Sequence, residues 1–257
     1  MMAEFNVGSV LVTGSNRGIG LGLVKQFLQL PNPPEWIFAT TRELDGPQSK
    51  ELIELALKCP NLVVLQLDVT DPNSIKAAAQ RVEEHVQEHG LNLLINNAGI
   101  ARMTTMEDEN AETMAIIYAT NTVGPLLVSQ EFLPLLKKAA QQSTQTGLSC
   151  SKAAIVNMSS LSSSLEQLPL WELWKFPSYR CSKVALNMIT RCQSLEYKDY
   201  GILSTPIHPG WVKTRMGTEK APQTVEETTQ AILKMLSMLS EKENGSFVGW
   251  NGQIYPW

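Results

Sequence analysis

Hydrophobic positions along the chain gather into short runs, which are separated by longer stretches with helical spacing. The runs are SVLV (9–12), WIFAT (36–40), LVVLQL (62–67), LNLLI (91–95), AAIVNM (153–158) and ILSTPI (202–207). Between them, apolar residues recur at the spacing of amphipathic helices, as in 21–30, 73–89 and 179–198. Apolar strands that alternate with helices predict a parallel sheet that is covered on both faces.

The predicted fold class is therefore α/β. We expect a Rossmann-type doubly wound parallel sheet of about seven strands, in a single domain over residues 1–257, with ligands beyond the carboxyl ends of the strands. Two segments look inserted into this pattern. One is the polar stretch 141–152, and the other is LEQLPLWELWKFP (165–177), which contains two tryptophans and a phenylalanine.

Composition agrees with one globular domain, because 43% of the 257 residues are hydrophobic. The 21 basic and 25 acidic residues give a formal net charge of −4, which favours neither nucleic acid nor an anionic membrane as a partner. No apolar stretch approaches the roughly 20 residues of a membrane span. The N-terminal MMAEFNVGSV lacks the features of a secretory signal, and the four cysteines form no C-x-x-C pair. We therefore expect reduced thiols and a cytoplasmic location.

A glycine-rich segment follows the first predicted strand. TGSNRGIG (13–20) lies between SVLV and the helical stretch 21–30. A strand, a glycine-rich turn and a helix place a phosphate at the helix N-terminus, and the glycines let the backbone approach it closely. On its own this pattern is a weak signal, because many turns contain glycines for packing reasons.

Further motifs follow in chain order and make the signal specific. They are NNAG (96–99), Asn121 within ATNTVGPLLVSQ (119–130), the pair Ser159 and Ser160 at the end of the fifth strand, YRCSK (179–183) and HPGWVKT (208–214). Reduction of a carbonyl needs a proton donor, and a free tyrosine, with a pKa of about 10, exchanges its proton poorly at neutral pH. Lys183 shares a helix face with Tyr179, so its ammonium is expected to lower the pKa of the phenol. A half-buried helix tyrosine is the plain alternative.

With these motifs in this order, the sequence resembles the short-chain dehydrogenase/reductase family along essentially its whole length. The ending GWNGQIYPW and the insert before Tyr179 make it most similar to carbonyl reductases of the sniffer and C-factor type. The resemblance implies that the catalytic residues are Asn121, Ser160, Tyr179 and Lys183. Ser160, the second serine of its pair, would bind the substrate oxygen, Lys183 would hold the nicotinamide ribose, and Asn121 would support a water-linked proton path to Lys183.

The resemblance also implies contacts to a dinucleotide. Asp68 would meet the adenine amino group, residues 97–99 would line the adenosine side, and Val212 and Thr214 would contact the carboxamide of the nicotinamide. A helix-capping role is the alternative for Asp68. The full predicted cofactor set is Gly14, Ser15, Asn16, Arg17, Gly18, Ile19, Gly20, Arg42, Asp68, Val69, Asn97, Ala98, Gly99, Tyr179, Lys183, Val212 and Thr214.

Two arginines predict which dinucleotide this is. An NAD-binding fold usually places an acid about 20 residues after the glycine turn. Here the second strand ends in Arg42, and Glu43 comes one step later. Arg17 and Arg42 would converge on the adenosine 2′ position, where two charge-assisted contacts of roughly 1.5–3 kcal/mol each would favour NADP(H). A solvated surface position is the alternative for Arg17.

One competing motif is H-x-x-E-H, a zinc-protease pattern formed by His85, Glu88 and His89. It lies just ahead of Gly90, a predicted helix C-cap, and therefore at the wrong end of the sheet for the cleft. We expect two histidines on a solvated helix face and no metal site. His208 is expected to be a packing or supporting residue.

The predicted function is an NADPH-dependent carbonyl reductase of aldehydes, ketones or quinone-like compounds, with Tyr179 as the proton donor. The alternatives are an NADP-dependent alcohol or hydroxysteroid dehydrogenase, and a non-catalytic NADP-sensing protein. The expected partner is a small carbonyl compound, and a homodimer is a further expectation. The insert aromatics should cover either the pocket or a subunit contact, and Met216 could close the pocket from the opposite side; these residues are Trp171, Trp174 and Phe176.

Overall fold

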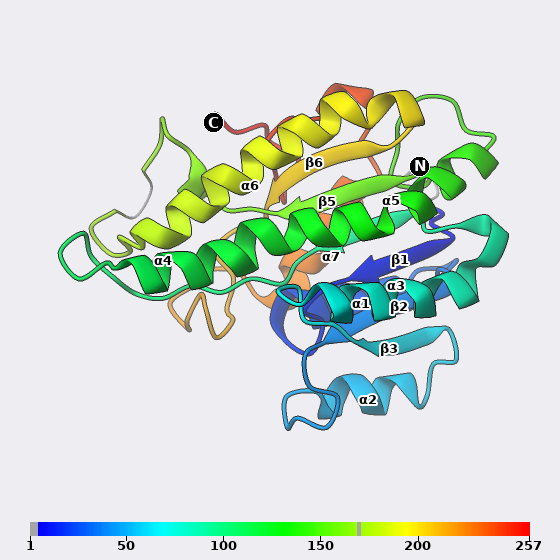
Figure 1. The fold of residues 1–257 in the computed structure, drawn as a ribbon, viewed down its shortest axis with the longest axis horizontal. Helices are drawn as coiled ribbons and strands as arrows, with labels where there is room; N and C mark the ends of the chain where they lie inside the picture. Colours follow the sequence, from blue (N-terminus) through cyan, green and yellow to red (C-terminus); the bar gives the residue numbers. More distant parts are fainter. Residues whose placement is uncertain (1–4, 169–170) are drawn as a thin grey trace.

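The computed structural model describes residues 5–168 and 171–257 and shows one seven-stranded sheet (Figure 1). Its strand order is β3-β2-β1-β4-β5-β6-β7, and every neighbouring pair is parallel. The order confirms the predicted Rossmann-type doubly wound sheet. The strands are β1 (Ser9–Val12), β2 (Trp36–Thr41), β3 (Leu62–Gln66), β4 (Leu93–Asn96), β5 (Ala154–Met158), β6 (Leu203–His208) and β7 (Val248–Gly249).

Helices cover both faces of this sheet. They are α1 (Gly18–Leu28), α2 (Lys50–Ala56), α3 (Pro72–Val86), α4 (Ala111–Tyr118), α5 (Gly124–Gln142), α6 (Pro177–Glu196) and α7 (Val225–Leu236). Helices α1 and α7 pack together on one face, and α3, α5 and α6 lie on the other (Figure 1). Over residues 5–168 and 171–257, no helix is long and apolar enough to cross a membrane.

The first strand shows why its residues are uniformly apolar. Val10 and Val12 enter the core that contains α1 and α7, while Leu11 enters the core that contains α3 and α5. Because successive strand residues point to opposite faces, a strand that is buried on both sides needs a continuous apolar run. The strand order reverses between β1 and β4, so the ligand crevice lies beyond their carboxyl ends.

Two predicted segments differ in detail from the structure. Helix α5 extends to Gln142, so it takes up the start of the polar segment 141–152. Gly90 does not cap α3, which ends at Val86; it follows the 3₁₀ turn η1 (Gln87–His89) instead. A Cβ on Gly90 would come within 2.4 Å of the Leu135 carbonyl oxygen in α5, so close packing explains this glycine. The aromatic insert includes residues 169–170, which lie outside the described residues.

Candidate active site

The glycine-rich turn joins β1 to α1 and is held in place by the turn that follows β4. Thr13 Oγ1 accepts hydrogen bonds from the backbone N–H groups of Asn97 and Ala98, both at 3.0 Å. Asn97 Nδ2 in turn donates to the carbonyl oxygens of Thr13 and Gly14, at 2.9 and 3.1 Å. The Asn97 amide, which was predicted to line the adenosine side of the cleft, therefore shapes the glycine-rich turn itself.

The geometry of this turn fits a phosphate. Gly14 and Gly18 have φ values of +65° and +55°, in the left-handed region that favours glycine. A Cβ on Gly20 would come within 2.3 Å of the Gly14 carbonyl oxygen, so α1 can pack here only on a glycine. Helix α1 begins at Gly18 with no acid in its first turn, and Arg17 at the N-cap position does not cap it with its side chain. The N–H groups of such a helix start can bind an anion.

The other residues of the turn divide between core and surface. Ser15 is buried, and its hydroxyl donates to the Val12 carbonyl oxygen at 2.6 Å. Ile19 packs against the core on the α1 side of the sheet. Asn16 and Arg17 line an open hollow of about 510 Å³, which the start of α2 borders on its other side. Of the predicted contacts, Asn16 and Arg17 are thus the side chains that the turn exposes to a ligand.

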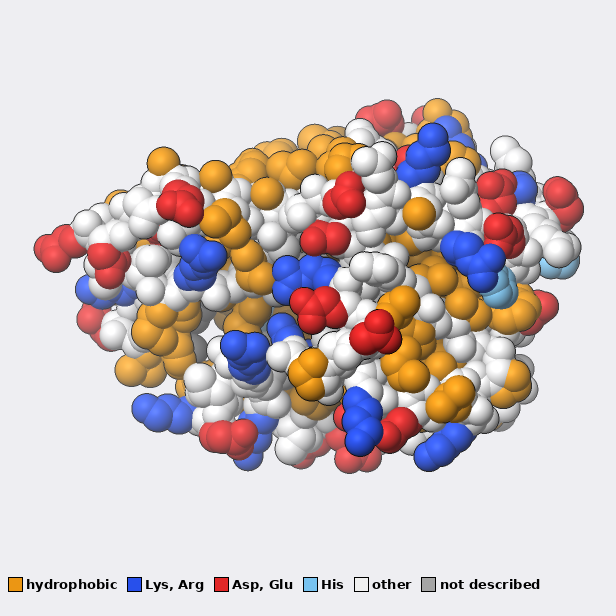
Figure 2. Space-filling view, turned by 60° about the horizontal axis from the view of Figure 1, so that its bottom comes forward, with side chains coloured by type: hydrophobic (Ala, Val, Ile, Leu, Met, Phe, Trp, Pro, Cys, Tyr) orange, Lys and Arg blue, Asp and Glu red, His pale blue; other side chains and the backbone are white. Residues whose placement is uncertain are grey.

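The predicted arginine pair is near a third arginine. Arg17 lies in the turn, Arg42 directly follows β2, and Arg215 lies in the loop after β6; all three are exposed. Partial burial lowers the pKa of Arg17 most, and the positive charges of Arg215 and Arg42 lower it further. Figure 2 shows Lys and Arg side chains gathered near the middle of one face. Sequence reasoning missed Arg215, although it directly follows Thr214, a predicted cofactor contact.

Asp68 lies just beyond β3 and is bound within its own loop. Its Oδ1 accepts hydrogen bonds from the backbone N–H and the hydroxyl of Thr70, at 2.9 and 2.7 Å. The capping role considered for Asp68 belongs instead to Asp71, whose carboxylate accepts from the N–H of Asn73 at the start of α3. Val69 is buried against Gly124, where a Cβ would lie 2.9 Å from its side chain. Val69 is therefore a packing residue in this structure.

The serine, tyrosine and lysine of the predicted catalytic set meet between β5 and α6. Ser160 follows β5, and its hydroxyl makes a hydrogen bond with Tyr179 in the first turn of α6. Lys183 Nζ lies 5.7 Å from the centre of the Tyr179 ring and donates to the Met158 carbonyl oxygen at 2.7 Å. Ser159 points elsewhere, because its hydroxyl donates to Asn187 Oδ1 at 2.6 Å. The geometry thus distinguishes the two neighbouring serines.

Burial dominates the electrostatics of this group. It raises the pKa of Tyr179, and the hydrogen bond with Ser160 lowers that pKa in part. Burial also lowers the pKa of Lys183 to about 8. The prediction that Lys183 lowers the tyrosine pKa is therefore wrong for this structure, because both groups are desolvated. The Tyr179 phenol stays protonated at neutral pH, which is the state that can donate a proton.

Asn121 lies in η2 (Ala119–Val123), a π-helical segment between α4 and α5. Its Oδ1 accepts from the Ile100 N–H at 2.9 Å, and its Nδ2 donates to the Ile100 carbonyl oxygen at 2.8 Å and to Ser182 Oγ at 3.1 Å. A Cβ on Gly99 would lie 3.3 Å from Asn121 Oδ1 and 3.7 Å from Lys183 Nζ, so the asparagine, the lysine and the NNAG turn meet here. The proton path through Asn121 stays a prediction.

Aromatic side chains form a wall beside Tyr179. Trp174 and Phe176 stack with ring centres 5.4 Å apart, and Phe176 meets the Tyr179 ring edge-on at 6.2 Å. Trp211, from the loop after β6, contacts Trp174 edge-on at 6.2 Å. Arg180 fixes the wall by donating to the carbonyl oxygens of Lys175 and Trp174, at 2.7 and 2.9 Å. We call Trp174, Phe176 and Trp211 the aromatic wall.

The loop after β6 brings further predicted residues close to the glycine turn. Val212 is buried and pairs with Gln223, and Thr214 lies so near Gly18 that a Cβ there would be 3.4 Å from the threonine methyl group. Met216, which was expected to close the pocket, is 47% exposed. Trp211, which the sequence analysis did not single out, is the side chain from this loop that reaches the aromatic wall. Its place in HPGWVKT was the available signal.

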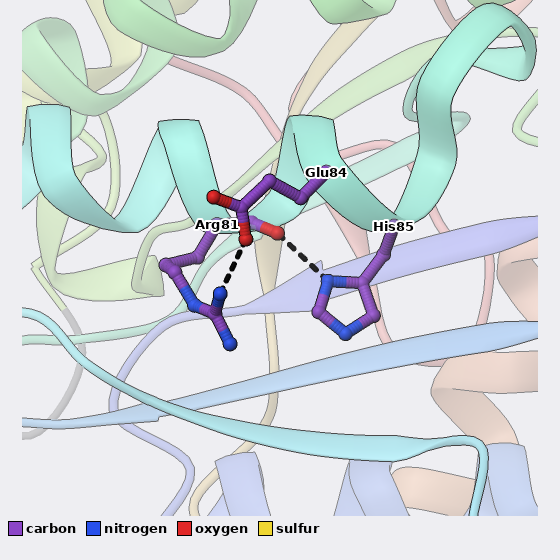
Figure 3. Close-up of polar contacts among 3 residues, drawn as sticks. All are labelled: Arg81, Glu84 and His85. Atoms are coloured by element: carbon purple, nitrogen blue, oxygen red, sulfur yellow. Dashed lines mark hydrogen bonds and ion pairs between the residues drawn. The ribbon is translucent and has the colours of Figure 1, made fainter.

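The H-x-x-E-H segment lies on α3 and η1, and Figure 3 shows its first residue, His85, with Arg81 and Glu84. The His85 ring packs edge-on against Trp36, with centres 4.8 Å apart, so this predicted surface histidine is half-buried. Its Nδ1 lies 2.8 Å from the Arg81 carbonyl oxygen, and the Arg81 guanidinium pairs with Glu84. Within residues 5–168 and 171–257, no group of three or more His, Cys, Asp or Glu side chains could hold a metal ion.

His208 is the last residue of β6 and lies next to the backbone that follows Ser160. Its Nδ1 accepts the backbone N–H of Leu161 at 3.2 Å, and its ring meets Tyr255 edge-on. Burial lowers the pKa of His208 to about 4, so the ring is neutral at neutral pH. Since Leu161 directly follows Ser160, this neutral histidine helps to hold the backbone next to the predicted catalytic serine.

Comparison with known families agrees with this geometry. The model of the short chain dehydrogenase family matches residues 8–225, which include the glycine turn, the serine and the Tyr-x-x-x-Lys pair. The chain belongs to this family. The predicted resemblance is thereby confirmed, and this short-chain dehydrogenase is an oxidoreductase.

Three relatives of this short-chain dehydrogenase are informative. The structure of NADPH-bound carbonyl reductase from chicken fatty liver is 56% identical and superposes with a TM-score of 0.97, over 100% of this chain and 96% of that chain. Carbonyl reductase Sniffer of D. melanogaster is 38% identical with a TM-score of 0.93, over 98% and 100%. Estradiol 17-beta-dehydrogenase 2 of Mus musculus is 33% identical over 81% of this chain and 49% of its own length.

Proposed function

We propose that this short-chain dehydrogenase is an NADPH-dependent carbonyl reductase. The observation that carries the proposal is the hydrogen-bonded pair of Ser160 and Tyr179, which lies beside Lys183 at the carboxyl end of the sheet. When bound, NADPH supplies the hydride to the carbonyl carbon. Ser160 binds the substrate oxygen, and the Tyr179 phenol donates its proton to that oxygen as negative charge develops there.

The crevice residues support NADPH as the cofactor. The start of α1 and its glycines suit a diphosphate, and Arg17 and Arg42 take the place of the acid that would bind an unphosphorylated ribose. Lys183 is buried at the meeting point of the NNAG turn and β5, where it would hold the nicotinamide ribose. The 56% identical relative with bound NADPH supports the same cofactor.

The aromatic wall favours a hydrophobic carbonyl substrate. Trp174 and Phe176 place apolar surface next to Tyr179, and such surface excludes water and binds aromatic or alicyclic compounds. The indole Nε1 of Trp174 is buried with no hydrogen-bond partner among the described residues. The wall therefore also holds one N–H group that could donate a hydrogen bond to a second oxygen of the substrate. Aromatic diketones and quinones meet both conditions, whereas simple aromatic ketones meet only the first.

A hydroxysteroid dehydrogenase is the second candidate, and the 33% identity to a mouse estradiol 17-beta-dehydrogenase favours it. A cofactor sensor without turnover is disfavoured, because the Ser160–Tyr179 pair and Lys183 are intact. A homodimer and a cytoplasmic location stay predictions. Exposed apolar side chains on α4 and α6 support the homodimer, namely Met114, Ile116, Tyr118 and Met188.

The test is NADPH oxidation by the purified protein with aldehydes, aromatic ketones, diketones, quinones and steroid ketones. We expect turnover to be fastest with planar hydrophobic dicarbonyls and much slower with NADH. Faster reduction of NADP⁺ by a hydroxysteroid would favour the second candidate. NADPH binding without turnover on any compound in either direction would contradict both enzymes and favour a sensor.

A further inference from the structure

Two arginines from distant segments lie within electrostatic range of Arg17, at the start of α1. Arg17 belongs to the glycine turn, Arg42 to the end of β2 and Arg215 to the loop between β6 and α7. After burial, the charges of Arg215 and Arg42 are the two influences that lower the pKa of Arg17, so both guanidinium groups lie within electrostatic range of it. Like charges repel, so this arrangement favours an anion between them.

Packing of the loop against the glycine turn places Arg215 there. The Thr214 methyl group would lie 3.4 Å from a Cβ on Gly18, which is ordinary van der Waals contact. Arg17 precedes Gly18, and Arg215 follows Thr214. The contact between Gly18 and Thr214 therefore brings the two neighbouring arginines to the same part of the crevice from opposite elements.

Hydrogen bonds hold the loop in this position. Thr214 Oγ1 accepts from the Gly217 N–H at 3.0 Å, and the Thr214 carbonyl oxygen accepts from the Thr218 N–H at 2.8 Å. Trp211 Nε1 donates to the Gly217 carbonyl oxygen at 2.6 Å. Arg215 thus projects from a preformed turn, and less conformational freedom is lost when it binds a ligand.

None of the three arginines forms an ion pair with a described carboxylate, and the two glutamates that share the hollow with Arg17, Glu51 and Glu54, are paired with lysines. In the described part of the chain, the ion pairs are Lys25–Glu51, Lys50–Glu54 and Arg81–Glu84, and none includes Arg17, Arg42 or Arg215. A phosphate dianion can accept hydrogen bonds from several planar guanidinium groups, which also neutralise it. Such a ligand would relieve the repulsion that the fold imposes.

We propose that Arg215 is a third arginine of the 2′-phosphate site, and that it binds this phosphate of NADPH from the loop between β6 and α7. The inference rests on the proposed NADPH dependence and adds a specificity-determining residue to it. It also connects cofactor choice to the substrate side, because the loop that carries Arg215 contributes Trp211 to the aromatic wall.

Cofactor binding by the variant Arg215→Ala, measured by calorimetry or by NADPH fluorescence, tests this role. Lys213→Ala is the matched control, because it removes the same charge from the same loop at an exposed site where the lysine faces Glu227 of α7. Loss of a charge-assisted contact should raise the Kd for NADPH roughly tenfold or more. The Kd for NADH should change less than about twofold, and Lys213→Ala should alter neither value by more than that.

Adenosine 2′-phosphate and adenosine 5′-phosphate extend the test without the nicotinamide. Arg215→Ala should weaken the first selectively, and Arg215→Lys should lose part of that affinity because it keeps the charge but not the planar fork. Equal weakening of NADPH and NADH would overturn the assignment to the 2′-phosphate, as would equal behaviour of Arg215→Ala and Lys213→Ala. A wild-type protein without preference for NADPH would contradict the proposed cofactor itself. A preserved preference in Arg215→Ala would overturn only the role of Arg215.

Discussion

Replacement of Tyr179 by phenylalanine separates proton donation from the rest of the site. The change removes one oxygen and keeps the ring that meets Phe176 edge-on at 6.2 Å. It also leaves Lys183 bound to the Met158 carbonyl oxygen. The hydroxyl partner of Ser160 is the main contact that disappears. The variant should therefore fold normally and still bind the cofactor.

The expected magnitudes follow from these contacts. Loss of a positioned general acid lowers kcat/KM by about 10²–10⁴-fold, or roughly 3–5.5 kcal/mol in activation free energy. The lost hydrogen bond to Ser160 changes the free energy of unfolding by only about 1 kcal/mol, since phenylalanine is buried more easily than tyrosine. That corresponds to a shift of about 2–4 °C in the melting temperature. The Kd for NADPH should change less than about twofold, because the lysine stays in place.

The assay compares steady-state NADPH oxidation with NADPH binding and thermal unfolding of the same samples. Tyr197→Phe is the control, since it removes the same atom from a buried tyrosine at the far end of α6. Its activity should match that of the wild type. If Tyr179→Phe retained more than about a tenth of wild-type kcat/KM, another group would have to donate the proton, and the mechanism would be refuted.

Three further predictions follow from the site. Arg42→Ala should raise the Kd for NADPH roughly tenfold and leave that for NADH nearly unchanged, and a double variant with Arg17→Ala should lose most of the preference and keep only the part that Arg215 contributes; a preference as large as that of the wild type in the calorimeter would contradict the clamp. His208 has a folded-state pKa of about 4, below its unfolded value, so it contributes stability above about pH 6.5 that is lost as the pH falls toward 4. His208→Asn keeps an acceptor for the Leu161 N–H, so its free energy of unfolding in denaturant titrations should fall by up to about 3 kcal/mol less than that of the wild type over this pH range. If the two proteins lost stability in parallel as the pH fell, His208 would not be the cause. Trp174→Ala and Phe176→Ala should raise KM for aromatic ketones more than for small aldehydes, and the mass of the protein in solution should not change. Unchanged kinetics together with dissociation of a dimer into monomers would instead show that the insert forms a subunit interface.

The sequence predicted the sheet well because its strands are buried on both faces. A strand such as SVLV in β1 must be apolar at every position when alternate residues enter opposite cores. The terminal strand β7 was not predicted, since Val248–Gly249 is only two residues long and is defined by its pairing with β6. The π-helical turn at Asn121 was also not predicted. A local sequence pattern shows periodicity, but it does not show which neighbouring strand or helix stabilises a very short element.

The site was predicted only in part, because residue spacing can be read from the sequence but burial and tertiary contacts cannot. The spacing of Tyr179 and Lys183 reveals their shared helix face, but it does not reveal burial, and burial reverses the expected shift in the pKa of Tyr179. His85 was assigned to solvent because helix spacing alone does not show that its ring packs edge-on against Trp36. Arg215 and Trp211 were missed because the loop that carries them is positioned by its own hydrogen bonds, including Trp211 Nε1 to the Gly217 carbonyl oxygen.

Helix α6 joins catalysis to substrate selection within one turn of its N-terminus. Tyr179 is the proposed proton donor, and the next residue, Arg180, donates to the backbone carbonyl oxygens of Lys175 and Trp174 and so fixes the aromatic wall. Glu109 holds this end of the helix by accepting the Ser178 N–H at 3.1 Å. Trp174 and Phe176 belong to the inserted segment, so Arg180 ties the end of this segment to the helix that carries Tyr179. Such a scaffold keeps the reacting oxygen within reach of the phenol, while the length and side chains of the insert can differ between relatives and change which carbonyl compound fits.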